Sequence, residues 1–96
     1  MEAMWLHPSN PLAPTGLKVD SKTAVQAVIS WTAVTDSRGI KAYDVYKDGV
    51  KVASPTTPTY TATGLTTATT YKFKVKAVAN NNMVSDFSTE LSVTTS

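Results

Sequence analysis

The stretch Tyr71-Lys72-Phe73-Lys74-Val75-Lys76-Ala77 decides the fold, because it alternates apolar and lysine side chains without interruption. Successive side chains of a β-strand point to opposite faces of its sheet. One face of this segment therefore presents two rings and two small apolar groups to a core, and the other presents three ammonium groups to water. The sequence predicts a half-buried strand over residues 70–79.

The rest of the chain is also typical of β-structure, since no apolar repeat keeps helical spacing over three turns. In the second expected strand, Val25, Ala27, Ile29 and Trp31 share one parity and are expected to face the core. Asp48-Gly49 predicts a two-residue type I′ hairpin, which needs positive φ at both positions. Seven strands are predicted, at residues 15–20, 24–32, 41–47, 50–54, 59–63, 70–79 and 89–95.

Three residues indicate how these strands are arranged. Trp31 lies inside the second predicted strand, and Leu65 precedes Tyr71 by six residues. A tyrosine at this place can lie across the edge of a Greek-key sandwich and donate its hydroxyl to a backbone carbonyl a few residues upstream. We therefore expect Trp31, Leu65 and Tyr71 to be structural residues of an all-β, seven-stranded Greek-key β-sandwich.

With these residues and the closing Leu91-Ser92-Val93, the chain resembles a fibronectin type III domain from about Pro14 to Thr95. Residues 13–17 (APTGL), 43–49 (YDVYKDG) and 60–65 (YTATGL) are similar in particular to type III modules of bacterial extracellular enzymes that degrade polysaccharides, such as chitinases. One departure is Thr67, where animal members often carry proline. The resemblance implies an immunoglobulin-like sandwich, secreted as an accessory module of a larger, bacterial glycoside hydrolase.

Composition fits one small domain and argues against several classes of function. The 96 residues carry 9 basic and 7 acidic side chains and no cysteine. The small net charge does not favour a nucleic-acid interface, and the lack of cysteine excludes disulfides and thiolate metal sites. No apolar run approaches the ~18 residues that cross a bilayer. We expect a monomer without nucleic-acid or membrane partners, whose partners are neighbouring domains of a parent chain.

The chain is expected to divide into a flexible lead-in at residues 1–13 and a type III domain at residues 14–96. Pro8 and Pro11 lie in the lead-in, which we interpret as a linker or a cloning-derived sequence, and Pro14 follows directly. The first ten residues lack the basic start and long apolar stretch of a signal peptide, so any targeting signal is expected elsewhere in a parent protein.

Catalytic groups are scarce in this sequence. His7 is the only histidine and lies in the lead-in, so a Ser/His/Asp arrangement on the sandwich is not credible. Turn chemistry accounts for Asp36 and Asp48, and no closely spaced acidic motif of a calcium loop occurs. We expect no enzyme, no metal site and no cofactor in this domain.

The candidate ligand surface comprises Tyr46, Phe87, Lys72, Lys74 and Lys76. Exposed aromatic rings can stack on sugars, and a lysine stripe can attract an acidic glycan. The same stripe is also typical of a solvated sheet face that discourages edge pairing. No two aromatic residues are placed by the sequence to form an obvious planar platform.

The number of strands leads to the functional hypothesis. If each of seven antiparallel strands crosses the sandwich, the chain enters at one pole and leaves at the other, which suits a spacer that positions neighbouring domains. Two alternatives remain open: a carbohydrate-binding accessory module that uses the candidate ligand surface, and a protein-interaction or adhesion domain that uses an edge strand or the asparagine-rich loop at residues 80–86.

Overall fold

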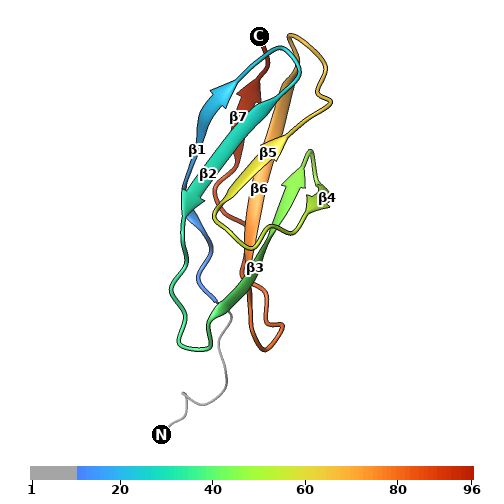
Figure 1. Cartoon of the computed structure of the whole chain (residues 1–96). Helices are drawn as coiled ribbons and strands as arrows, with labels where there is room; N and C mark the ends of the chain where they lie inside the picture. Colours follow the sequence, from blue (N-terminus) through green and yellow to red (C-terminus); the bar gives the residue numbers. More distant parts are fainter. Residues whose placement is uncertain (1–10) are drawn as a thin grey trace, which may run out of the picture.

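The computed structural model describes residues 11–96, which form seven strands in two sheets (Figure 1). The three-stranded sheet has the order β1-β2-β5 and the four-stranded sheet the order β4-β3-β6-β7, and every pairing is antiparallel. This is the predicted Greek-key sandwich. The strands are β1 (Thr15–Lys22), β2 (Ala27–Thr32), β3 (Ile40–Lys47), β4 (Val50–Ala53), β5 (Thr59–Ala62), β6 (Thr70–Ala79) and β7 (Leu91–Thr94).

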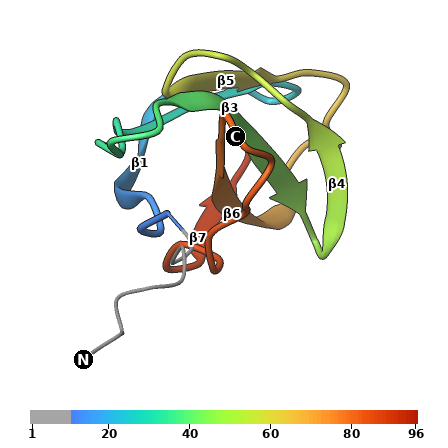
Figure 2. The ribbon, with the colours of Figure 1, turned by 90° about the horizontal axis from the view of Figure 1, so that it is seen from below.

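Strand β6 shows the alternation that its sequence predicts. It pairs with β3 so that Val75 faces Val45 and Ala77 faces Tyr43, and all four side chains are buried. The intervening lysines are half-buried or exposed. The core lies between the two sheets, which surround it when the molecule is viewed along its long axis (Figure 2).

The predicted start of the second strand is wrong by three residues, whereas the other predicted strand ends differ from the structure by two residues at most. Strand β2 begins at Ala27 rather than at residue 24, and the side chain of Val25 is 54% exposed instead of facing the core. The Thr23 N–H donates to the Gln26 carbonyl, so residues 23–26 form a turn. Alternation alone could not reveal this turn, because Val25 happens to share the parity of the buried residues.

The Asp48-Gly49 hairpin is confirmed. The φ angles of Asp48 and Gly49 are 51° and 87°, both positive as a type I′ turn requires, and Lys47 pairs with Val50 directly across the turn. Strand β4 therefore folds back onto β3 and forms one edge of the four-stranded sheet.

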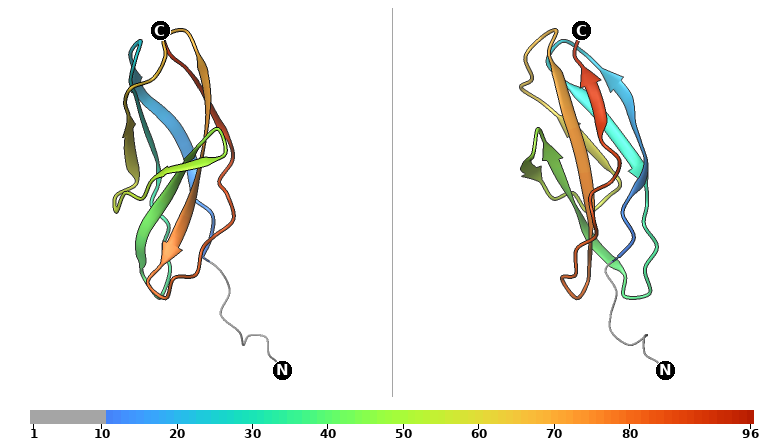
Figure 3. Two further views of the ribbon diagram at one scale, coloured as in Figure 1. Left: turned by 90° about the vertical axis from the view of Figure 1, so that its right-hand side faces the viewer. Right: turned by 180° about the vertical axis from the view of Figure 1, so that it is seen from behind.

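The described chain runs from one pole of the sandwich to the other (Figure 3). We call the end where residue 11 lies the Pro11 pole and the opposite end the Ser96 pole. The β2–β3 and β6–β7 loops lie at the Pro11 pole (Figure 1). Residues 11–96 contain no helix, and hence none long and apolar enough to cross a membrane.

Candidate functional site

Trp31 of β2 joins the two sheets through its contact with Tyr43 of β3. Its side chain is 5% exposed, and its ring meets Tyr43 edge to face with 5.4 Å between the ring centroids. The Tyr43 hydroxyl in turn accepts a hydrogen bond from the Val34 N–H at 3.0 Å. Leu65 is 4% exposed and packs in the same cluster. Trp31 and Leu65 therefore act through packing and are not available to a ligand.

Tyr71 is bonded differently from the expectation. Its hydroxyl accepts a hydrogen bond from the Thr66 N–H at 2.8 Å, whereas the sequence predicted donation to a carbonyl. Hydrogen bonding from Thr66 lowers the pKa of the Tyr71 phenol, because a donor favours the ionised oxygen. The Lys47 ammonium lies 5.3 Å from the ring centroid and acts in the same direction. The residue still ties the segment after Leu65 to β6, with the roles of donor and acceptor exchanged.

The five candidate ligand residues lie on the outer side of the four-stranded sheet, and four of them contact one another. The rings of Tyr46 and Phe87 are 4.9 Å apart between centroids. The Lys76 ammonium lies 4.3 Å from the Phe87 centroid and 5.7 Å from that of Tyr46, and the Lys74 ammonium lies 5.1 Å from that of Phe87. Within residues 11–96, Lys72 takes no part in these ring contacts. We call these five residues the aromatic–lysine face.

Phe87 reaches this face because two serines anchor the segment around it to β6. The Ser88 hydroxyl accepts the Val75 N–H at 2.9 Å, and the Ser85 hydroxyl accepts the Ala77 N–H at 2.8 Å. Both serines are buried, while Phe87 between them is 41% exposed. In the segment before β7, these two hydroxyls accept the β6 N–H groups that the carbonyls of a neighbouring strand would otherwise accept. Sequence reasoning missed this role, since serine is common in loops and gives no distinctive signal.

The geometry of the aromatic–lysine face limits what it can hold. The two rings stand at 83° to one another, so they offer no flat platform for a sugar chain. The ammonium groups above Phe87 give the face a cationic character instead. Its carboxylates are engaged: Glu90 lies 3.9 Å from Lys74, and Asp44 lies 3.4 Å from Lys51.

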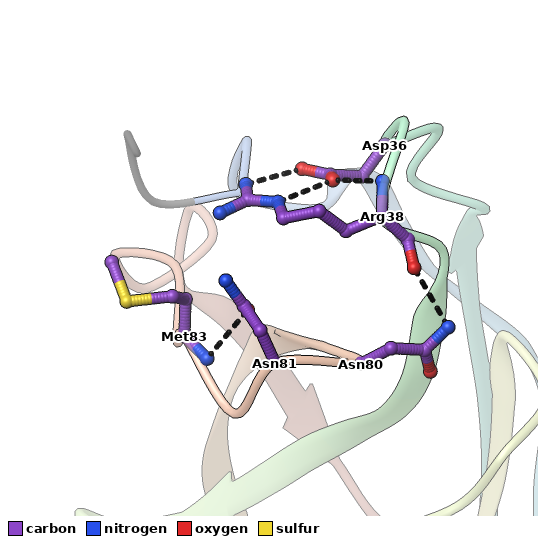
Figure 4. Close-up of polar contacts among 5 residues, drawn as sticks. All are labelled: Asp36, Arg38, Asn80, Asn81 and Met83. Atoms are coloured by element: carbon purple, nitrogen blue, oxygen red, sulfur yellow. Dashed lines mark hydrogen bonds and ion pairs between the residues drawn. The ribbon is translucent and has the colours of Figure 1, made fainter. Parts of the chain in front are cut away.

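A second polar cluster lies at the Pro11 pole (Figure 4). The Asp36 carboxylate accepts two hydrogen bonds from the Arg38 guanidinium, at 2.8 Å and 2.7 Å, and one from the Arg38 N–H at 2.9 Å. These bonds lower the pKa of Asp36 to about 2. Asn80 donates its amide to the Arg38 carbonyl at 2.7 Å, which joins the β2–β3 loop to the β6–β7 loop. The sequence predicted the Asp36 turn but not its pairing with Arg38.

No catalytic or metal-binding group emerges from the part of the chain that the structure covers. Residues 11–96 contain no cluster of three histidine, cysteine, aspartate or glutamate side chains that could hold a metal ion. Among the carboxyl groups of the described residues, Asp36 alone has a strongly lowered pKa, and it is engaged by Arg38 in a loop. His7 lies outside the described residues, as does most of the predicted lead-in.

Several bacterial enzymes contain a segment that is similar to this chain. Chitinase Chi52 of Paenibacillus xylanexedens is 48% identical over 86 residues, which is 90% of this chain and 16% of that enzyme. Exoglucanase B of Cellulomonas fimi is 45% identical over 85 residues, covering 88% of this chain and 8% of the enzyme. Chitinase ChiA74 from Bacillus thuringiensis superposes with a TM-score of 0.83 at 29% identity, over 90% of this chain and 13% of the other.

The chain thus spans a sixth or less of the length of these relatives. In these relatives, the similar module is a small accessory part of a larger bacterial chitinase or glucanase. The model of the fibronectin type III domain matches residues 12–94, nearly the whole of the sandwich. Together with the seven-stranded topology and the sequence identity, this match shows that the chain belongs to the fibronectin type III domain family.

Proposed function

We propose that this domain is a non-catalytic spacer that positions neighbouring domains of a secreted bacterial polysaccharide-degrading enzyme. The observation that carries the proposal is the placement of residue 11 and Ser96 at opposite poles of the sandwich (Figure 3). The longest strand, β6, has ten residues and spans about 33 Å at ~3.3 Å per residue. Domains attached at the two poles would be held apart by roughly this distance.

A spacer is useful only if the chain leaves it in a fixed direction, and the Ser96 pole meets this requirement. The Ser96 N–H donates to the Thr23 carbonyl at 3.2 Å. The Ser96 carbonyl accepts the Thr67 hydroxyl at 2.5 Å and the Ala68 N–H at 3.2 Å. The end of the sandwich is therefore held between two loops, at residues 23–26 and 66–69. These contacts stiffen the junction, and two of the three join backbone atoms only, which sequence patterning does not reveal.

The Pro11 pole is also packed. Pro11 and Pro14 are buried, although Leu12 between them is 74% exposed. Proline restricts the backbone of both residues, because its ring fixes φ. The chain is therefore held close to the sandwich where it approaches β1, which supports a defined geometry on this side too.

The setting of the relatives also favours a spacer over a substrate-specific binder. Similar modules belong to an enzyme named a chitinase and to another named an exoglucanase. A module that accompanies enzymes for different polymers is better suited to a mechanical role than to recognition of one polymer. We therefore place the domain in a secreted enzyme, beside a catalytic domain, and outside the chemistry itself.

A distance measurement tests the proposal directly. The 96-residue chain would be placed between two fluorescent protein domains, and the distribution of distances between them measured by time-resolved energy transfer. We expect a narrow distribution, which should broaden when Trp31→Ala destabilises the sandwich. A distribution as broad as that of a glycine–serine linker with the same number of residues would contradict the spacer.

A second experiment separates the spacer from a module that binds neutral polysaccharide. The isolated chain would be mixed with insoluble chitin and with cellulose, and the supernatant assayed after sedimentation. We expect the protein to remain in the supernatant at low and high salt. Retention on either solid at high salt would assign the domain a binding role instead.

A further inference from the structure

We propose that the aromatic–lysine face binds an acidic polysaccharide along the row formed by Lys72, Lys74 and Lys76. The proposal concerns a surface that the spacer role does not use. Binding at this face and separation of neighbouring domains are independent, so either can fail without the other.

The lysine row has a regular spacing. The three residues occupy alternate positions of β6, so their Cα atoms repeat about every 7 Å along the strand. An extended polymer with regularly spaced carboxylates can follow such a row and meet one ammonium group after another. An isolated anion would engage only one or two of them.

Two of the three ammonium groups make contacts that restrict their positions. The Lys76 ammonium lies against both rings, 4.3 Å from the Phe87 centroid and 5.7 Å from the Tyr46 centroid. The Lys74 ammonium lies 5.1 Å from the Phe87 centroid and 3.9 Å from the Glu90 carboxylate. A side chain that is ordered before binding loses less conformational freedom when a ligand arrives. This distinguishes the face from an ordinary row of mobile surface lysines.

The face also has cationic charge left over. Asp44 is engaged by Lys51 at 3.4 Å and by the Ser54 hydroxyl at 3.0 Å. Among residues 11–96, no carboxylate lies within 4.0 Å of the ammonium groups of Lys72 or Lys76. The complementary ligand is therefore an anion.

The rings favour an acidic polysaccharide over the other polyanions. A nucleic acid would be expected to stack its bases on flat, accessible aromatic faces. Tyr46 and Phe87 stand at 83° and lie beneath the ammonium groups, so they do not provide such faces. Phe87 nevertheless remains 41% exposed, and this exposed part of its side chain offers apolar contact to the C–H groups of a sugar ring whose carboxylate meets a lysine.

Affinity electrophoresis of the 96-residue protein tests this inference, with polygalacturonate as the acidic polymer and hydroxyethylcellulose as the neutral one. We expect retardation by polygalacturonate alone, and weaker retardation as salt is added. The double variant Lys72→Gln/Lys76→Gln should bind about tenfold more weakly or worse, as loss of hydrogen bonds to charged groups implies. The matched control is Lys18→Gln/Lys22→Gln, which removes the same charge from β1 in the other sheet.

The outcomes separate the proposal from its competitors. Absence of retardation by polygalacturonate would overturn the proposal. It would also be overturned if the control pair weakened the retardation as much as Lys72→Gln/Lys76→Gln does, because the effect would then depend on net charge alone. Equally tight binding of a single-stranded oligonucleotide, with the same dependence on Lys72 and Lys76, would overturn the choice of a polysaccharide. None of these results bears on the distance measurement, so failure of this inference leaves the spacer intact.

Discussion

The two faces of β6 carry different kinds of side chain at alternating positions of one strand. Toward the core, Phe73, Val75 and Ala77 are fully buried. Toward water, Lys74 and Lys76 lie over the ring of Phe87 and remain partly exposed. The inner face gains its stability from buried apolar area, whereas contacts of the outer face are shared with solvent. Substitutions should therefore be costly on the inner face and nearly neutral for folding on the outer one.

Trp31→Ala should have the largest effect, because it removes the ring that joins the two sheets. We expect a loss of about 3 to 5 kcal/mol in the free energy of unfolding, from lost burial and the cavity left behind. Urea denaturation followed by circular dichroism measures it. Trp31→Phe is the control and should lose clearly less, since Nε1 has no hydrogen-bond partner within the described chain. A parent-like midpoint for Trp31→Ala would show that the inner face is not the main source of stability.

Ser88→Ala should cause the second-largest loss in the free energy of unfolding. Ser88 bonds the edge of β6, where its two faces meet. The substitution removes the hydroxyl that accepts the Val75 N–H and leaves that buried donor without its partner. We expect a cost of about 1 to 3 kcal/mol in the same urea experiment. Ser92→Ala, on the exposed side of β7, is the matched control and should stay within about 0.5 kcal/mol of the parent. Equal effects of the two alanines would mean that water replaces the Ser88 hydroxyl.

Tyr71→Phe should lower the free energy of unfolding, measured in the same urea experiment, by less than Ser88→Ala does. The lost acceptor serves the Thr66 N–H, and Thr66 is exposed, so water can take its place. Tyr60→Phe is the control, because the Tyr60 hydroxyl forms no hydrogen bond with the described residues while its ring is similarly half-buried. A decrease as large as that of Ser88→Ala would show that the tyrosine corner excludes water.

The inner face is what the sequence predicts best. The alternation along β6, the Asp48-Gly49 turn and the burial of Trp31 all follow from side-chain parity and backbone preference, which are local properties. Val25 is the instructive exception. Its parity matches that of Ile29, yet the chain turns before β2 and leaves Val25 exposed. The hydrogen bond from the Leu65 N–H to the Val25 carbonyl, which joins residues distant in sequence, helps to place this turn.

The outer face could be predicted only in part. Parity places Tyr46 and the lysines on it, but Phe87 reaches it through serine hydroxyls that bond β6 across a loop. Contacts between residues 46 and 87 depend on tertiary structure that no local pattern encodes. The same holds for the bonds around Ser96 and for the pairing of Asp36 with Arg38.

The smallest predicted effect tests whether the outer face is ordered at all. In a double-mutant cycle, Lys76→Gln and Phe87→Leu should be coupled by about 0.5 to 1 kcal/mol, because leucine keeps an apolar side chain but lacks the aromatic face that attracts the ammonium. The free energies of unfolding of the parent, the two single variants and the double variant come from urea titrations.

Lys18→Gln combined with Phe87→Leu is the control cycle. Lys18 lies on β1 in the other sheet and is paired with Asp20, so the two changes should add within about 0.3 to 0.5 kcal/mol. Additivity in both cycles would mean that Lys76 moves freely above the ring. In that case the outer face would be an ordinary solvated surface, and the case for a pre-ordered lysine row would lose its physical basis.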